Sequence, residues 1–199
     1  MKKALFLLSC SLVHAAPYYL PTPPGGGLTP YDWQPTWLLE GLYAKGAHHT
    51  PDTCGFRFNL QLYNNGEDRI RHEFGTGIAP QWGNDHRYYS EDFRTRQHVF
   101  HLPVTAGYTL NLGITDSIFL FLGGRAGWAY GHYKETAPDF HNSGNYSGFT
   151  FSAGGGLKIQ CNERLYVQLG YEFGRSYPHN RHHTIWGQHI ISTGLGWRF

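Results

Sequence analysis

The sequence predicts an all-β protein, an eight-stranded antiparallel transmembrane up-and-down β-barrel. From Ile191 to Phe199, apolar residues alternate strictly with small or polar ones, as in a strand with one face on hydrocarbon and the other in a polar interior. Aromatic residues make up 17% of the chain and 26 residues are glycine, both high for a soluble domain. Beyond the N-terminus, no stretch approaches the roughly 20 apolar residues of a transmembrane helix.

The N-terminus has the pattern of a secretory signal peptide. Lys2 and Lys3 precede an apolar run over residues 4–13, and small residues follow at 15 and 16, so we expect cleavage after Ala15. An alternative is lipid attachment, because residues 7–10 (Leu-Leu-Ser-Cys) have the form of a lipoprotein processing box.

Three segments are predicted: a signal peptide at 1–15, a Pro/Gly-rich periplasmic lead at 16–35 and the barrel at 36–199. Prolines and a Gly25–Gly27 run exclude regular structure from the lead. Without Lys2 and Lys3, the 16 Lys and Arg fall to 14, which equals the 14 Asp and Glu. A mature chain that is nearly neutral gives no indication of nucleic-acid binding.

Eight strands are expected, near the ~10 residues that a tilted membrane strand needs. They are Thr36–Gly46, Phe56–Tyr63, Arg69–Ala79, His98–Leu110, Ile118–His132, Phe149–Gln160, Leu165–Gly174 and Ile185–Phe199.

The first four strands each divide into two faces. The first places Leu39, Gly41 and Tyr43 outward, and the second sets Phe56, Phe58, Leu60 and Leu62 against Arg57, Asn59 and Gln61. The third opposes Ile70, Phe74 and Ile78 to Arg71 and Glu73, and the fourth carries Phe100, Leu102, Val104, Ala106 and Tyr108. Pro103 is expected to mark a bulge in the fourth strand.

The last four strands alternate in the same way. The fifth opposes Leu120, Leu122, Ala126, Trp128 and Tyr130 to Gly123, Arg125, Gly127 and Gly131. The sixth opposes Phe151, Ala153, Leu157 and Ile159 to Ser152, Gly154, Gly156 and Lys158. The seventh opposes Leu165, Val167, Leu169, Tyr171 and Phe173 to Gln168, Gly170 and Glu172, and the eighth closes the barrel.

The connections differ in length at the two ends of the barrel. Those after the second, fourth and sixth strands are short, and those after the third, fifth and seventh are longer and polar. This asymmetry indicates short periplasmic turns and longer extracellular loops, with both chain ends periplasmic. Cys54 and Cys161 then lie at opposite ends and should not form a disulfide.

The direction of the apolar face separates a membrane barrel from a soluble lipocalin-like one. The charged face is also rich in glycine, which suits a narrow polar lumen better than a solvated exterior. We therefore expect a lumen filled by a charge network, with a narrow ion path through its pairs as the alternative. Its predicted members are Glu40, Arg57, Arg71, Glu73, Arg125, Lys158 and Glu172.

Histidines gather in the predicted extracellular loops and at the strand ends beside them. They are His48, His49, His86, His132, His141, His179, His182 and His183. Imidazoles that converge could bind zinc, copper or haem, or titrate together, but the spacing matches no known ligand motif. No cofactor or metal site is therefore predicted.

Two further features of the loops bear on function. His141-Asn142-Ser143, with Asp139 and Glu135 nearby, is the only His-x-Ser of the kind that lipid A deacylases use. The second loop combines aromatic and basic residues, which indicates either a binding surface or an interfacial rim whose Arg residues contact lipopolysaccharide phosphates. These residues are Trp82, Arg87, Tyr88, Tyr89, Phe93, Arg94 and Arg96.

From Thr36 to Phe199 the chain resembles the small OmpA-like, opacity-type and attachment-invasion-type outer-membrane barrels. The resemblance rests on the stretches 102–108 (LPVTAGY), 154–157 (GGGL), 169–173 (LGYEF) and 194–199 (GLGWRF). It implies a non-enzymatic, monomeric protein of the bacterial outer membrane, without a cofactor and with a structural or adhesive role. A lipid A-modifying enzyme and a small ion channel are the alternatives; the Pro/Gly-rich lead does not fit the N-terminal helix of the palmitoyltransferases.

The resemblance also implies partners. Outer-membrane lipids and lipopolysaccharide would surround the barrel, and a host surface or matrix would meet the loops. The barrel-assembly machinery would recognise the C-terminal signature of Leu195, Trp197 and Phe199.

Overall fold

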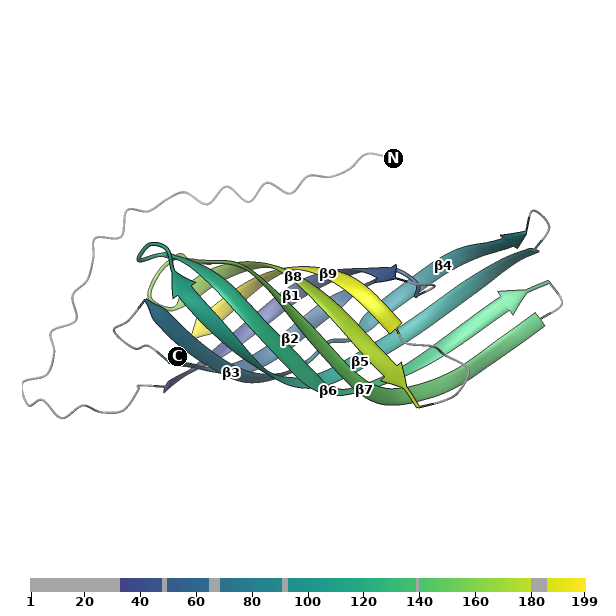
Figure 1. The fold of residues 1–199 in the computed structure, drawn as a ribbon, viewed down its shortest axis with the longest axis horizontal. Helices are drawn as coiled ribbons and strands as arrows, with labels where there is room; N and C mark the ends of the chain where they lie inside the picture. The colour runs from purple at the N-terminus through teal and green to yellow at the C-terminus, as the bar shows by residue number, and fades with distance from the viewer. Residues whose placement is uncertain (1–32, 48–49, 65–68, 91–92, 139, 180–185) are drawn as a thin grey trace, which may run out of the picture.

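A computed structural model describes residues 33–47, 50–64, 69–90, 93–138, 140–179 and 186–199. Nine β-strands form in these residues (Figure 1). They are β1 (Trp33–Ala47), β2 (Thr53–Asn64), β3 (Ile70–Ile78), β4 (Gln81–Ser90), β5 (Phe93–Gly113), β6 (Ile118–Ala137), β7 (Phe140–Gln160), β8 (Leu165–Pro178) and β9 (Trp186–Arg198).

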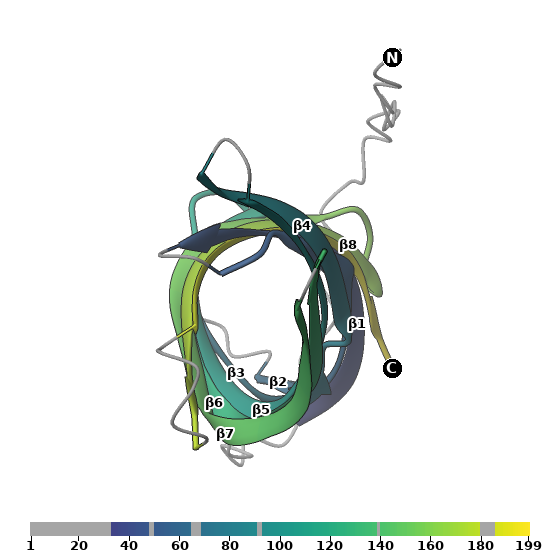
Figure 2. The ribbon, with the colours of Figure 1, turned by 90° about the vertical axis from the view of Figure 1, so that its right-hand side faces the viewer.

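The strands close into a ring of eight, because β3 and β4 occupy one position in it. Both pair with β5 in a single register, with Ile78 opposite Val104 and Gln81 opposite His101, and only Ala79 and Pro80 separate them. β1 pairs with both β2 and β9, which completes the ring (Figure 2). Every pairing is antiparallel, and the predicted eight-stranded up-and-down barrel is confirmed.

The bulge expected at Pro103 is wrong. The register of β5 against β6 runs through Pro103 opposite Ala129 without a shift. The carbonyl of Pro103 accepts a hydrogen bond of 3.0 Å from the Ala79 amide, so its side of the strand faces the point where β3 gives way to β4. A proline has no N–H to donate to a neighbouring strand. Pro103 is therefore tolerated opposite the interruption between β3 and β4.

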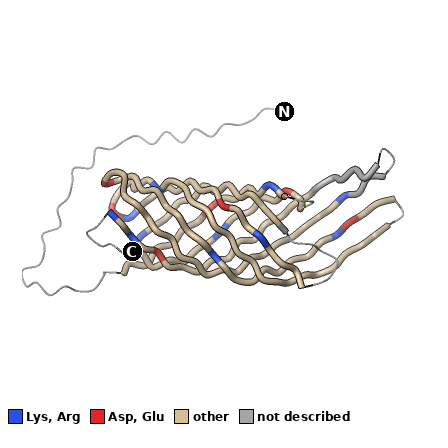
Figure 3. The backbone as a smooth tube through the Cα atoms, viewed as in Figure 1, with Lys and Arg blue, Asp and Glu red and all other residues tan. Residues whose placement is uncertain are grey.

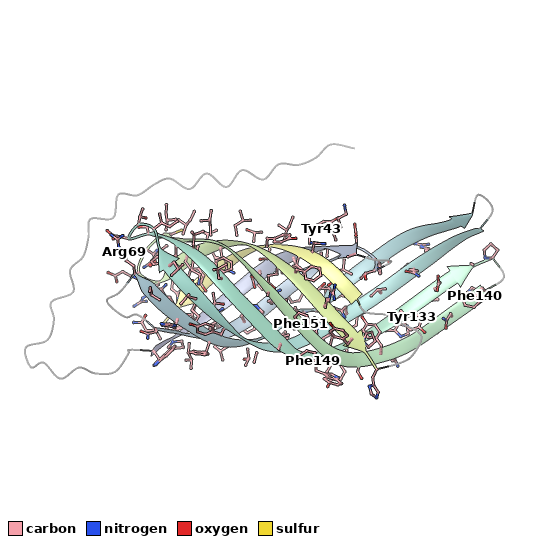
Figure 4. The ribbon with its side chains drawn as sticks, viewed as in Figure 1. Tyr43, Arg69, Tyr133, Phe140, Phe149 and Phe151 are labelled. Carbon is pink, nitrogen blue, oxygen red and sulfur yellow. The ribbon has the colours of Figure 1, made fainter. Side chains whose placement is uncertain are left out.

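The two faces of the strands are as predicted. Large apolar side chains cover the outer wall, with exposed fractions of 55% for Leu39 and 60% for Leu122, whereas Asn59 and Glu40 are fully buried inside. This arrangement excludes the lipocalin-like alternative, whose apolar face would point inward. Figure 4 shows the outward side chains along the length of the barrel.

The barrel is longer on one side than predicted. Residues expected in the second and third loops instead extend β4 to Ser90, start β5 at Phe93, end β6 at Ala137 and start β7 at Phe140. These four strands project beyond the others as two adjoining hairpins, which we call the protruding sheet (Figure 1). The polar sequence of the projecting ends hides them, because no apolar alternation marks these parts of the strands.

At the other end, which we call the turn end, the connections are short. Asn162 Oδ1 accepts hydrogen bonds from the amides of Arg164 and Leu165, and Thr115 Oγ1 accepts one from Ile118. Polar side chains that bond to nearby amides stabilise tight turns, so the predicted short turns form for a clear reason. Arg69 lies at this end and Phe140 at the far end of the protruding sheet (Figure 4).

β1 begins at Trp33, three residues before the predicted start of the barrel. The predicted signal peptide, the lipoprotein alternative and nearly all of the lead lie outside the described residues. Cys54 and Cys161 are both exposed and form no disulfide, as predicted. Over the residues that the structure describes, no helix has the length and apolar character needed to cross a membrane.

Candidate functional site in the barrel lumen

The first cluster in the lumen combines two carboxylates and two guanidinium groups from four strands. Arg57 Nη1 lies 2.7 Å from Glu172 Oε1 and 3.2 Å from Glu40 Oε2, so β2 connects with both β1 and β8. Arg125 of β6 lies 3.8 Å from Glu172 and 4.0 Å from Glu40. Two positive and two negative charges balance here, which a buried ionic cluster requires.

Neutral side chains complete the bonding of this cluster. Asn59 Nδ2 donates to Glu40 at 2.9 Å, and its Oδ1 accepts from Arg125 Nη1 at 2.7 Å. Ser152 donates to Glu172 at 2.9 Å, and Gln168 donates to Glu40 at 3.3 Å. The carboxylates are thereby held by both charged and neutral donors, and the cluster crosses the barrel from wall to wall.

A second pair lies nearer the turn end. Lys158 Nζ donates to Glu73 Oε1 at 2.6 Å, and both side chains are almost fully buried. The ammonium group also lies 4.7 Å from the centre of the Tyr166 ring. A salt bridge and a cation–π contact therefore hold the same lysine.

Arg71 has a different environment from the other predicted members. Its Nη1 donates to the Tyr63 hydroxyl at 2.5 Å, and its guanidinium lies 4.5 Å from the Phe119 ring centre. Arg198, which was not among the predicted members, is 5% exposed and lies 3.8 Å from the Tyr63 ring centre. Arg198 shares the inward phase of β9 with Ser192, Gly194 and Gly196. This alternation in the sequence could have identified it as a lumen residue.

Glycines provide the space for these charged side chains. A Cβ atom on Gly194 would lie 2.7 Å from Glu40 Cγ, and one on Gly107 would lie 2.7 Å from Arg125 Cγ. Both distances are too short for real carbon contacts, so larger residues would displace the cluster. The glycine-rich inner face and the charge network are thus parts of one packing arrangement.

A polar cavity lies on the protruding-sheet side of the first cluster. A small volume of about 30 Å³ is bordered there by Arg57 and Arg125, together with the side chains of Gln81, His101, Ser176 and Gln188. His101 Nδ1 lies 2.8 Å from the Tyr146 hydroxyl, and Thr53 and Gln188 are joined by a 3.1 Å bond. The lumen therefore keeps room for water-sized species above the cluster. Figure 3 shows the Lys, Arg, Asp and Glu positions along the backbone of the barrel.

The histidines do not converge in the part of the chain that the structure describes. His132 and His141 lie on β6 and β7 and are exposed, as is His179. No group of three or more His, Cys, Asp or Glu in the described residues could hold a metal ion. His48, His49, His182 and His183, and the side chain of His86, lie outside this description.

The His-x-Ser motif lies on β7, not in the middle of a loop as predicted. His141 and Ser143 share the outer face of the strand and are exposed. Glu135 lies in the opposite phase of β6, where it accepts a hydrogen bond of 3.1 Å from Gln97. The nearest described carboxylate therefore faces away from the His and Ser side chains, and Asp139 lies outside the described residues.

The aromatic and basic residues predicted for the second loop belong to β4 and β5. Trp82 is exposed and lies between Phe56 and Phe100, with ring centres 6.0 and 5.7 Å away, as part of an aromatic rim. Arg96 is exposed on β5. The side chains of Arg87, Tyr88, Tyr89, Phe93 and Arg94 are not described.

The C-terminal strand closes the ring. Trp197 lies opposite Trp37 of β1, and the Phe199 amide donates to the Pro35 carbonyl at 3.1 Å. Leu195, Trp197 and Phe199 are all exposed on the outer wall, at 53%, 44% and 61%.

Residues 4–199 match the model of a protein family described as the outer membrane protein beta-barrel domain. The chain belongs to this family. Its members are outer-membrane β-barrels, so the protein is a barrel of the bacterial outer membrane, and the predicted OmpA-like resemblance is confirmed. The turn end is then the periplasmic end, and the protruding sheet lies outside the cell.

Solved structures show a similar architecture. Ail, the attachment invasion locus protein of Yersinia pestis, is 16% identical with a TM-score of 0.50, over 85% of this chain and 99% of that chain. The N-terminal β-barrel domain of Pseudomonas aeruginosa OprF is 13% identical with a TM-score of 0.43, over 84% and 100% of the two chains. The Escherichia coli outer membrane protease OmpT is 10% identical with a TM-score of 0.44, over 84% and 94%.

At 16% identity, the similarity to Ail shows a likeness of fold alone. No curated protein matches the chain significantly.

Proposed function

We propose that this outer-membrane barrel is a non-enzymatic protein that contacts other surfaces through its protruding sheet. The observation that carries the proposal is the length of β4, β5, β6 and β7. The β5–β6 ladder continues to Arg96 opposite Thr136, and the β6–β7 ladder to Ala137 opposite Phe140, whereas β8 ends at Pro178 opposite Gly148. A rigid, hydrogen-bonded sheet that projects from the membrane suits recognition, because little conformational entropy is lost on binding.

The lumen supports the same proposal, because its charge network acts as a plug. Arg57, Glu40 and Glu172 join three strands across the interior, and Lys158 with Glu73 adds a second layer. An eight-stranded barrel is only wide enough to be filled by its own side chains. Free diffusion of solutes therefore does not fit this geometry, and the network stabilises the fold.

The alternative of a lipid A deacylase has a direct test. Replacing His141 and Ser143 together by alanine removes the His-x-Ser pair and leaves the inward face of β7 intact. We expect an unchanged lipid A mass profile in cells that express the double variant, relative to the parent. The enzyme would be established instead if lipid A lacked an acyl chain in cells that express the parent and kept it in cells that express the double variant.

Shortening the protruding sheet tests the proposed contact. Asn-Gly turns would replace residues 86–96 and 136–141, which leaves Asp85 opposite Gln97 and Glu135 opposite Asn142 at the new ends. Expressing cells should lose attachment to host-cell monolayers or immobilised matrix. The protein should still reach the outer membrane and change its gel mobility on boiling.

A matched control changes the other end of the barrel. Gly-Asn-Gly in place of Thr115, Asp116 and Ser117 alters a periplasmic turn and should leave attachment unchanged. Attachment by the shortened protein at the parental level, with its barrel intact, would refute the contact role of the sheet.

A further inference from the structure

The half of the lumen nearest the turn end holds more positive than negative charge. Three cations lie in its inward phase, namely Arg71, Lys158 and Arg198. Among the described residues, Glu73 is the one carboxylate that accompanies them. The first cluster, in contrast, balances two guanidinium groups with two carboxylates. Two positive charges in the periplasmic half are therefore left over.

The excess charge falls on the two arginines, because Lys158 takes the carboxylate. Lys158 Nζ lies 2.6 Å from Glu73 Oε1. The other oxygen, Glu73 Oε2, is buried and has no hydrogen-bond partner in the described part of the chain, so this carboxylate bonds to neither guanidinium group. No carboxylate of the described residues forms an ion pair with Arg71 or Arg198.

Arg198 shows the imbalance most clearly. It is 5% exposed, and its recorded contacts are with aromatic rings, whose centres lie 3.8 Å (Tyr63) and 5.9 Å (Tyr166) from the guanidinium carbon. Its Nε is buried and donates to no acceptor among the described residues. A guanidinium group has five N–H donors, and burying them without acceptors costs free energy that contacts with rings offset only in part. The environment of Arg198 therefore favours an anionic ligand.

Arg71 approaches the same tyrosine from a different strand. Its Nη1 donates to the Tyr63 hydroxyl at 2.5 Å, and its Nε is also buried without a partner in the described residues. Tyr63 thus contacts Arg198 through its ring and Arg71 through its hydroxyl. Because both guanidinium groups meet one side chain, a single ligand beside Tyr63 can bridge them.

The position of the two arginines opens toward the periplasm. Arg71 is the second residue of β3 and is half-buried, and the Arg198 amide donates to the carbonyl of Arg164 in the last short turn at 2.8 Å. The first cluster fills the lumen farther from this end. A ligand would therefore enter from the periplasm, and the inward phase of both arginines separates them from the surrounding lipids.

We propose that Arg71 and Arg198 bind a small oxyanion of the periplasm, of the chemical class of inorganic phosphate, which balances the buried charge of the lumen. Guanidinium groups offer paired N–H donors that match the oxygens of such an anion. An oxyanion is favoured over a single-atom anion because its several oxygens can bridge two guanidinium groups. The proposal does not rest on the contact role of the protruding sheet.

Unfolding in the presence of phosphate tests the proposal. A ligand that binds only the folded barrel raises its stability, and the effect follows the binding curve. Purified protein in a neutral detergent would be unfolded in urea and followed by gel mobility without boiling, with increasing inorganic phosphate at constant ionic strength. We expect the urea midpoint of the parent to rise with phosphate along a saturable curve.

Two double variants locate the effect. R71Q/R198Q should weaken the apparent phosphate affinity by about tenfold or more, because the charge-assisted hydrogen bonds are lost. R69Q/R164Q removes two exposed arginines at the same end and should respond like the parent. A general stabilisation by phosphate that is excluded from protein surfaces would act on all three proteins alike.

Asn111→Asp tests the charge balance without removing an arginine. Asn111 lies opposite Arg71 in the ladder of β3 and β5, is 1% exposed, and its Oδ1 has no hydrogen-bond partner among the described residues. A carboxylate of the same size would supply negative charge beside Arg71. N111D should therefore unfold at a higher urea concentration than the parent without phosphate, and should gain less from phosphate.

Four results would overturn the proposal: a phosphate response that does not follow a saturable curve, the parental response in R71Q/R198Q, an equal loss of response in R69Q/R164Q, or the full response in N111D. If R71Q/R198Q does not assemble into a barrel, the response of N111D decides. Parental attachment by the shortened barrel would refute the proposed function and leave this inference unaffected, because it is a different assay on a different variant.

Discussion

At the residue scale, Glu40 is the side chain on which the lumen network depends most. It is fully buried and contacts Arg57, Asn59, Arg125 and Gln168 from three other strands. A carboxylate in such a place is stabilised only by its partners, and the two guanidinium groups depend on it in turn.

Replacing Glu40 by alanine should lower the free energy of unfolding by about 3–5 kcal/mol, because it leaves buried positive charge without compensation. Urea unfolding in detergent micelles, followed by gel mobility without boiling, measures this loss. Arg164→Ala, at an exposed turn position, should change the same quantity by less than about 0.5 kcal/mol. A parental unfolding curve for Glu40→Ala would mean that the cluster is not coupled to stability.

The pair of Lys158 and Glu73 permits a double-mutant test. Glu73→Gln alone should destabilise the barrel by about 3 kcal/mol, because the buried ammonium group loses its charge partner. Lys158→Met added to this variant should restore most of the stability, since an apolar chain packs against the Tyr166 and Phe121 rings that lie 4.7 and 5.9 Å from the present ammonium group. The urea midpoints of the parent, the two single variants and the double variant are compared. Additive losses of stability in the double variant would contradict this pairing.

At the scale of elements, β9 decides whether the barrel closes. It pairs with β8 along one side and with β1 along the other, and Phe199 packs against Trp37 with ring centres 5.7 Å apart. The side chain of Phe199 is nevertheless 61% exposed, so it contributes little to the packing of the finished fold. Its expected role is therefore in assembly.

Phe199→Ala should reduce the fraction of the protein that becomes heat-modifiable in the outer membrane several-fold. The assembled molecules should keep their unfolding free energy within about 1 kcal/mol, because an outward side chain meets lipid in either case. Phe140→Ala, at the far end of the protruding sheet and 47% exposed, is the matched control and should assemble normally. Equal assembly of both variants would argue against a signal at the C-terminus.

At the scale of the whole molecule, the even strand number places both ends of the barrel wall on one side of the membrane. The short turns, Cys161 among them, lie on that side, and the protruding sheet lies on the other. We expect the lumen network between them to prevent small reagents from passing through the barrel.

A membrane-impermeant maleimide should therefore distinguish the two ends. In a Cys54→Ser background, Cys161 should react only after the outer membrane is permeabilised. His141→Cys in a chain that also carries Cys161→Ser should react on intact cells, because residue 141 is exposed on the protruding sheet. Labelling in the reverse order would invert the assigned topology.

The sequence predicted the barrel wall well where two different environments border one strand. Phe56, Leu60 and Leu62 alternate with Arg57, Asn59 and Gln61, and the structure places the two sets on opposite faces of β2. The protruding parts of β5 and β6 were predicted as loop, because water lies on both of their faces and no alternation results. Pro103 was misjudged because a sequence does not reveal that β3 and β4 are interrupted opposite it.

The sequence alone determined which side chains point into the lumen, since the period of two fixes the face of every residue in a strand. Tertiary structure decided which of them meet. Arg57 reaches Glu172, 115 positions away, and Arg71 meets Tyr63 in place of a carboxylate, because ring closure and the stagger between strands set the height of each residue. The level of a residue along the barrel axis depends on all the strands together, and no single segment of the chain encodes it.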